Sequence, residues 1–239
     1  MDYQNQCQEL DTRIRSTQKI GPEDCYISDG IVDINAWRQQ KFRPLFIGKE
    51  AYDYAERPLW NYTDWLKNSP QEAFSASRRT WGATAYISYA LQNGMNAYSK
   101  LPRLSEDEQV DNALQTIAFI NVGKLGGKNK TSWFRLNSLY QQNAHLLREQ
   151  IEFYQPNIII GWSTLDFFEK DEKFRSRFGY DPTKKMTLDR VDYLLADDKL
   201  FIDAYHPAYL GVPLDEYVNS IIAAVKKHKN EIDQSLPTL

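Results

Sequence analysis

Four short runs of apolar residues, separated by stretches with helical spacing, dominate the pattern of the chain. The runs lie at 44–48, 116–122, 157–162 and 199–205. Unbroken apolar runs of this length are typical of parallel strands that helices cover on both faces. Apolar positions three and four residues apart predict helices at 72–92, 106–113, 137–154 and 214–230. This alternation predicts an α/β fold, a three-layer sandwich around a central, mainly parallel four-stranded sheet.

The segment before the first strand is amphipathic. Leu10 and Ile14 recur at helical spacing within residues 1–20, and a Gly-Pro pair then ends the helix. We interpret residues 1–40 as an N-terminal helical extension. Residues 41–239 form a single α/β domain in this interpretation, because no repeat, low-complexity segment or linker divides them.

Local signals refine three further segments. Ser105 precedes the helix at 106–113 and has Glu108 three residues after it, which predicts a capping box. Ser163 is expected to cap a short helix after the third strand. Residues 169–190 are charged and without a clear period, and they predict an excursion from the core.

The composition excludes several classes of protein. The 239 residues include only two cysteines and three separated histidines, which build neither a disulfide framework nor a zinc site. We expect no metal and no cofactor. No signal segment opens the chain and no apolar run approaches the ~18 residues of a membrane span, so we expect a cytoplasmic protein without membrane contact. Because a chain of this length buries a large core unaided, we expect a monomer.

Charge is unevenly distributed along the chain. The net charge of -3 argues against a protein that coats nucleic acid through bulk electrostatics. Residues 73–148 are nevertheless locally basic, with nine basic side chains against four acidic ones. Such a face suits phosphate groups, although an ordinary mixed surface produces the same count. Aromatic residues form 13% of the chain, which suits a site that stacks flat ligands.

Each predicted strand ends in a chemically distinctive group. Glu50 follows the first strand, Asn121 lies in the second, Ser163 follows the third and His206 the fourth. The carboxyl ends of parallel strands share one edge, where open α/β folds bind ligands. We therefore expect the Glu50 carboxylate, the Asn121 amide and the His206 imidazole to converge. Taken singly, Glu50 also fits a solvated loop and Asn121 a turn.

A glycine- and lysine-rich loop continues from the second strand. It contains Gly126 and Gly127 together with Lys124, Lys128 and Lys130. We expect the backbone N–H groups of the glycines and the lysine ammonium groups to clamp phosphates. The loop lacks the Ser or Thr that follows the lysine of a Walker motif, so it does not predict a P-loop.

Four segments in this order resemble the uracil-DNA glycosylase superfamily. They are Gly48-Lys49-Glu50-Ala51-Tyr52, Asn121-Val122-Gly123-Lys124, the helix and strand at 147–161, and His206-Pro207-Ala208-Tyr209-Leu210. The family's first motif carries Pro where this chain has Ala51, and its His-Pro-Ser motif carries Ser where this chain has Ala208. The four cysteines of the family's iron–sulfur class are absent.

The resemblance implies the fold of that family and a role for each candidate. Glu50 would position or activate water, Asn121 would read the base edge, and His206 would stabilise the departing base. Gly48 belongs to the first motif. Tyr52, Trp60 or Tyr62 would stack on a flipped base, with Trp60 favoured by its distance after Glu50 but also fitting a packing role. These groups suit hydrolysis of an N-glycosidic bond, in which the sugar becomes positive and the base negative.

Our first hypothesis is a DNA-repair N-glycosylase that cleaves the N-glycosidic bond of uracil or another modified base, with single-stranded or duplex DNA as its partner. An alternative is a catalytically silent module of the same fold that binds nucleic acid or a modified base, with salt-sensitive binding and no base release. A second alternative is a hydrolase of free nucleosides or nucleotides, which would turn over small molecules.

Overall fold

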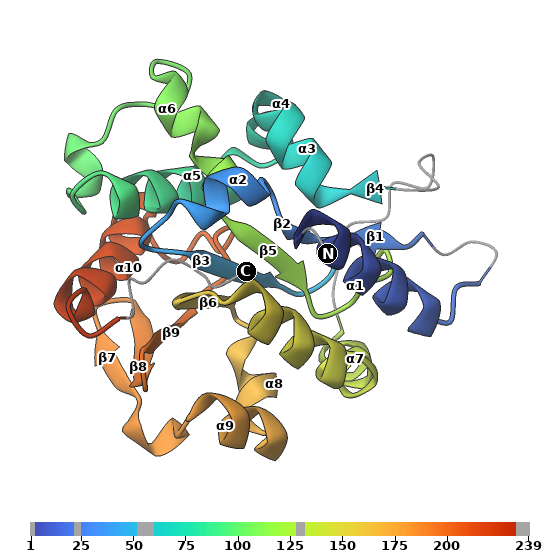
Figure 1. The fold of residues 1–239 in the computed structure, drawn as a ribbon. Coiled ribbons are helices and arrows are strands. Elements are labelled where there is room, and N and C mark those ends of the chain that lie inside the picture. The colour runs from blue at the N-terminus through green and yellow to red at the C-terminus, as the bar shows by residue number, and fades with distance from the viewer. Residues whose placement is uncertain (1–2, 22–24, 52–59, 128–131, 233–239) are drawn as a thin grey trace.

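A seven-stranded mixed sheet forms the centre of the computed structural model, which describes residues 3–21, 25–51, 60–127 and 132–232 (Figure 1). The strand order is β2 (Gly30–Ile31), β5 (Ala118–Asn121), β3 (Pro44–Gly48), β6 (Ile158–Trp162), β9 (Lys199–Ala204), β8 (Val191–Ala196), β7 (Met186–Leu188). A separate parallel pair consists of β1 (Ile27–Ser28) and β4 (Trp60–Asn61).

The four predicted strands are confirmed as β5, β3, β6 and β9, which lie side by side and parallel. The predicted size of the sheet is wrong, because β2, β8 and β7 add antiparallel strands at its edges. The strand β2 has only two residues, too few for a periodic signal. The hairpin between β8 and β9 turns at Asp197, which has a φ of 52° although it is not a glycine. The Asn-Gly or Asp-Gly pair that usually marks such a turn in a sequence is therefore absent.

Helices cover both faces of the sheet, as the three-layer prediction requires (Figure 1). On one face pack α3 (Tyr62–Asn68), α4 (Pro70–Ala76), α5 (Arg78–Gln92), α6 (Glu108–Asp111) and α10 (Leu214–His228). On the other pack α1 (Tyr3–Thr17), α2 (Ile34–Arg38), α7 (Trp133–Tyr154), α8 (Leu165–Glu169) and α9 (Glu172–Phe178). Short 3-10 turns occur at Tyr98–Lys100, Asn112–Thr116 and Pro182–Lys184.

The strand β3 shows why its residues form a buried strand. Leu45 and Ile47 pack into the core beneath α7, while Phe46 points into the core beneath α5. Successive side chains of a strand point to opposite faces, so both faces need apolar residues. All three side chains are fully buried. The unbroken apolar run at 44–48 therefore reflects cover on both sides.

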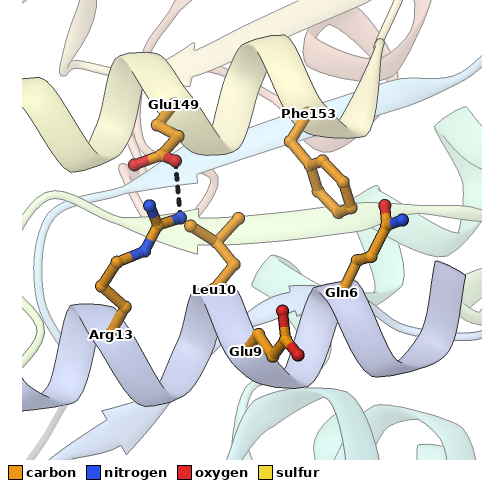
Figure 2. A pocket seen from close by; sticks show the side chains of 6 residues that line it. All are labelled: Gln6, Glu9, Leu10, Arg13, Glu149 and Phe153. Atoms are coloured by element: carbon orange, nitrogen blue, oxygen red, sulfur yellow. Dashed lines mark hydrogen bonds and ion pairs between the residues drawn. The ribbon is translucent and has the colours of Figure 1, made fainter. Parts of the chain in front are cut away.

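The predicted N-terminal helix is present as α1, and it packs into the core. Leu10 and Ile14 are buried with α7, and Arg13 pairs with Glu149 of α7 at 2.5 Å (Figure 2). A shallow groove of about 390 Å³ lies between these two helices, with Phe153 on its α7 side. Since β2 pairs with β5 and α1 packs on α7, residues 3–21 and 25–40 contribute to the same sheet and core as the rest of the described chain.

Two predicted helix caps are wrong. Asp107, and not Ser105, caps α6 by accepting the N–H of Gln109, and Ser105 has a φ of 67°. The residue before α8 is Thr164, and Ser163 has a φ of 54°. A cap needs extended backbone, which neither serine adopts. None of the helices among the described residues is long and apolar enough to cross a membrane.

Trp37 tests whether the N-terminal segment is integral to the fold. Its side chain is fully buried and its Nε1–H donates to the Tyr154 carbonyl at 3.1 Å. We expect Trp37→Ala to lower the free energy of unfolding by about 3–5 kcal/mol, as measured by urea titration. The control Phe134→Ala alters an exposed side chain and should change it by less than about 0.5 kcal/mol. Equal, small effects would show that residues 3–40 are dispensable.

Candidate functional site

The carboxyl ends of β5, β3, β6 and β9 lie on one edge of the sheet. The register pairs Gly48 with Asn121, Ile47 with Gly161, and Trp162 with Ala204. Residues that follow these positions, Lys49 and Glu50 after β3 and His206 after β9, therefore leave the sheet on the same side. The register puts the ends of these strands at one edge, and the convergence of the three side chains stays a prediction.

Gly48 makes room for the Asn121 side chain. A Cβ atom at Gly48 would lie 2.5 Å from Asn121 Oδ1 and 2.9 Å from a ring carbon of Phe119. The main-chain N–H of Asn121 donates to Asp29 Oδ2 at 2.8 Å, and the residue is only 3% exposed. The amide of Asn121 thus lies against the end of β3, immediately before Glu50.

The Glu50 carboxylate is enclosed by the loop that follows β5. A Cβ atom at Gly127 would lie 2.4 Å from Glu50 Cδ, so only glycine fits this approach. The N–H of Gly123 donates to the Lys49 carbonyl at 2.8 Å and fixes the other side of the loop. Enclosure leaves the Glu50 side chain 3% exposed.

Arg135 supplies the positive charge beside Glu50. Its Nε lies 3.3 Å from Glu50 Oε2, although the angles do not form a hydrogen bond. Within the described residues this buried oxygen accepts no hydrogen bond at all. A buried acceptor without a donor is costly, so Oε2 is suited to accept from a bound molecule.

His206 is held as a neutral ring. Its Nδ1 accepts the N–H of Ala208 at 3.1 Å, which places the proton of the neutral ring on Nε2. The ring stands edge-on to Trp162, with centroids 5.4 Å apart. Burial, together with the nearby positive charge of Lys49, lowers the pKa of His206 to about 4. At neutral pH the ring therefore presents an uncharged N–H donor.

Arg79 of α5 anchors the loop that carries His206. Its guanidinium donates to the carbonyls of Pro207 at 2.6 Å and Tyr209 at 3.0 Å, and also to that of Val212. Three carbonyls on one rigid donor fork fix the path of residues 206–212. Beyond this anchor, Leu210 is 82% exposed.

Exposed aromatic rings surround the edge. Lys49 Nζ lies 4.8 Å from the ring centroid of Trp133, which is exposed at the start of α7. Tyr205 and Tyr209 form an exposed pair with centroids 5.1 Å apart. A groove of about 530 Å³ runs between Trp133 and the two tyrosines. Acidic side chains, including Asp166 and Asp203, outnumber the one basic side chain in its lining, Arg190.

The predicted phosphate clamp is not supported by the structure. Lys124 is fully buried and its ammonium lies 2.8 Å from Asp29 Oδ1, so it cannot reach a phosphate at the surface. The N–H groups of Gly126 and Gly127 donate within the protein, to the carbonyls of Cys25 and Ala51. A lysine is normally exposed, and the burial of this one depends on its partners Asp29 and Gln150, which are distant in the chain.

Four other predicted contacts cannot be placed. Tyr52, Lys128 and Lys130 lie outside the described residues, as does the side chain of Trp60, whose backbone begins β4. Tyr62 is buried in the core against Trp81 and Phe119, so the prediction that it stacks on a base is wrong. Conversely, sequence reasoning missed Asp29, Arg79, Arg135 and Trp133, which the fold brings to the edge. None of these residues lies in a motif, so no sequence signal marks them.

One group of carboxylates in the described residues has the spacing of a metal site. Oxygens of Asp166, Glu169 and Asp203 lie within 4.8 Å of one another. The ammonium of Lys185 pairs with Glu169 and lies 3.1 Å from Asp203, so a cation is already present. Burial raises the pKa of Asp203 to about 6 in spite of that lysine. Lys185 therefore balances the negative charges of Glu169 and Asp203 within the protein.

Comparison with known proteins adds no relative. No model of a known protein family matches the chain, and a search of curated proteins finds no match.

The neutral state of His206 is testable by NMR. We expect the ring to titrate with a pKa of about 4. Lys49→Met should raise this pKa, because a positive neighbour is removed, but only in part, because burial is the larger cause. Lys100→Met, which changes an exposed lysine after α5, is the control and should leave the titration unchanged. Titration of the parent His206 near 6.5 would contradict the burial that we describe.

The anchoring role of Arg79 predicts a local change in dynamics. Arg79→Ala removes the donors of three loop carbonyls, so we expect faster amide hydrogen exchange in residues 206–212. Exchange in the central strands should stay unchanged. The neighbouring variant Arg78→Ala is the matched control, since Arg78 donates none of these bonds. Unaltered exchange in the loop of Arg79→Ala would show that other contacts hold it.

Proposed function

We propose that the protein is an N-glycosylase with a uracil-DNA glycosylase-like fold, which hydrolyses the bond between deoxyribose and uracil or another modified base in DNA. The observation that carries the proposal is the shared edge of Glu50, Asn121 and a neutral His206, which lie at or just after the ends of the parallel strands β3, β5 and β9. The proposal also agrees with the order of the four motif-like segments along the chain.

Glu50 acts on the sugar side of the bond. Its Oε2 is buried and accepts no hydrogen bond from the described residues, so it can accept one from water. In that position the carboxylate orients the water and opposes the positive charge that develops on the sugar. The guanidinium of Arg135 lies beside this carboxylate and supplies the opposite charge.

His206 and Asn121 act on the base. The Nε2–H of neutral His206 donates to the base oxygen on which negative charge develops, as an oxyanion-type donor. The Asn121 amide both donates and accepts, which is what an amide–imide base edge requires. Tyr209 and Leu210 are exposed on the loop that Arg79 anchors, and we assign to them the entry into the space that a flipped nucleotide leaves.

Release of free base tests the proposal. The parent protein should release a base from single- or double-stranded DNA that contains uracil, hypoxanthine, xanthine or an alkylated base. Glu50→Gln and His206→Asn should each lower the rate by about 10²- to 10⁴-fold, because each removes a group that acts in the transition state. Arg103→Ala, which changes an exposed side chain, is the control.

Each other outcome has a distinct meaning. Undiminished release by both variants would refute the roles of Glu50 and His206. Salt-sensitive DNA binding without any release would favour a silent binding module. Turnover of free nucleosides, with DNA left intact, would favour a hydrolase of small molecules.

A further inference from the structure

A buried ion pair lies directly behind Asn121. Lys124 Nζ is 2.8 Å and 2.9 Å from the two oxygens of Asp29, and 2.8 Å from Gln150 Oε1. Gln150 in turn donates to Asp29 Oδ1 at 3.1 Å. The two charged side chains are 0% and 2% exposed. Every group in this cluster is satisfied by another, which makes it rigid.

The cluster holds the residue that we propose reads the base. The strand β2 pairs with β5 only at Phe119 and Ala118, so the N–H of Asn121 lies beyond that ladder. Asp29 Oδ2 accepts this N–H at 2.8 Å in place of a strand carbonyl. The direction of the Asn121 backbone at the edge therefore depends on the side chain of Asp29.

The same cluster holds the turn that encloses Glu50. Lys124 lies midway along 122–127, and its carbonyl accepts the N–H of Ile27 at 2.9 Å. On one side of Lys124, Gly123 donates to the Lys49 carbonyl, and on the other Gly127 packs against the Glu50 carboxylate. The position of Lys124 thus links the two sides of the candidate site.

Stability alone does not account for the pair. Burial raises the pKa of Asp29 and lowers that of Lys124, and each is charged because of the other. Apolar residues of similar size often replace such a pair without loss of stability. A role that apolar residues cannot supply is the acceptance of the Asn121 N–H.

We infer that Asp29 and Lys124 are positioning residues, which aim Asn121 at the base edge and keep the 122–127 turn against Glu50. The inference rests on the proposed function for its effect on catalysis, but its structural part is independent of it. Positioning errors of about 1 Å can lower a rate by about 100-fold.

The double variant Asp29→Leu/Lys124→Met tests the inference. It removes the acceptor and the ammonium together, so no charge is left unpaired and the fold should persist. We expect amide exchange at Asn121 to become about tenfold faster or more, because its N–H has lost its acceptor. We also expect kcat/KM for the preferred base to fall by about 100-fold, with little change for the poorest base. Loss of folded protein alone would lower kcat/KM for the preferred base and for the poorest base by the same factor.

Two further variants complete the design. Arg148→Met/Asp171→Asn breaks a partly buried ion pair elsewhere and should leave the discrimination between bases unchanged. Asp29→Asn/Lys124→Met also leaves no buried charge unpaired and keeps the volume of residue 29, but the amide has only one oxygen, so it should change Asn121 exchange and discrimination in the same direction by a smaller factor. If the Leu/Met double variant fails to fold, this variant tests the positioning role in its place.

The outcomes separate this inference from the proposed function. Parental discrimination and parental Asn121 exchange in the folded variants would overturn the inference. Absence of base release by the parent would overturn the proposed function, while exchange at Asn121 would still decide whether Asp29 and Lys124 position it.

Discussion

The parallel register of β5, β3, β6 and β9 is the constraint on which the rest of the structure depends. Backbone hydrogen bonds fix that register, and they place the ends of strands that are distant in the chain on one edge. The apolar faces of the same strands hold the two helical layers. Core and edge are therefore coupled, because a slip of one residue in a strand would move its side chains into the opposite helical layer and displace the edge residues.

The edge has a basic side and an acidic side. Lys49 and Arg135 lie near Glu50, whereas the groove beyond His206 is lined by acids such as Asp166 and Asp203. On the proposed function, phosphates would follow the basic side and avoid the groove, since like charges repel. The aromatic rings between the two sides would then contact bases and not the backbone of DNA.

Much of the central fold could be predicted, because long apolar runs mark strands that are buried on both faces. The short strand β2 and the strand β8, which mixes polar and apolar residues, were not predicted. They are strands because they pair with a neighbour, and no apolar run marks them in the sequence. Glu50 and His206 could be proposed as site residues because they follow strand ends. Lys124 was misjudged, since its burial depends on Asp29, which lies 95 residues away in the chain.

On the proposed function, the charges of Glu50 and His206 suit electrostatic stabilisation of a breaking bond better than proton transfer by His206. A neutral His206 leaves Glu50 as the negative group that faces a developing sugar cation, while its N–H still serves a developing anion on the base. A protonated ring would add a second cation beside Lys49 in a partly buried place, which burial disfavours. On the proposed function, the edge would stabilise opposite charges at the two ends of one bond without a proton transfer from His206. Hydrolysis of a bond to a good leaving base requires that division of charge, so His206 would act as an electrostatic donor and not as a general acid.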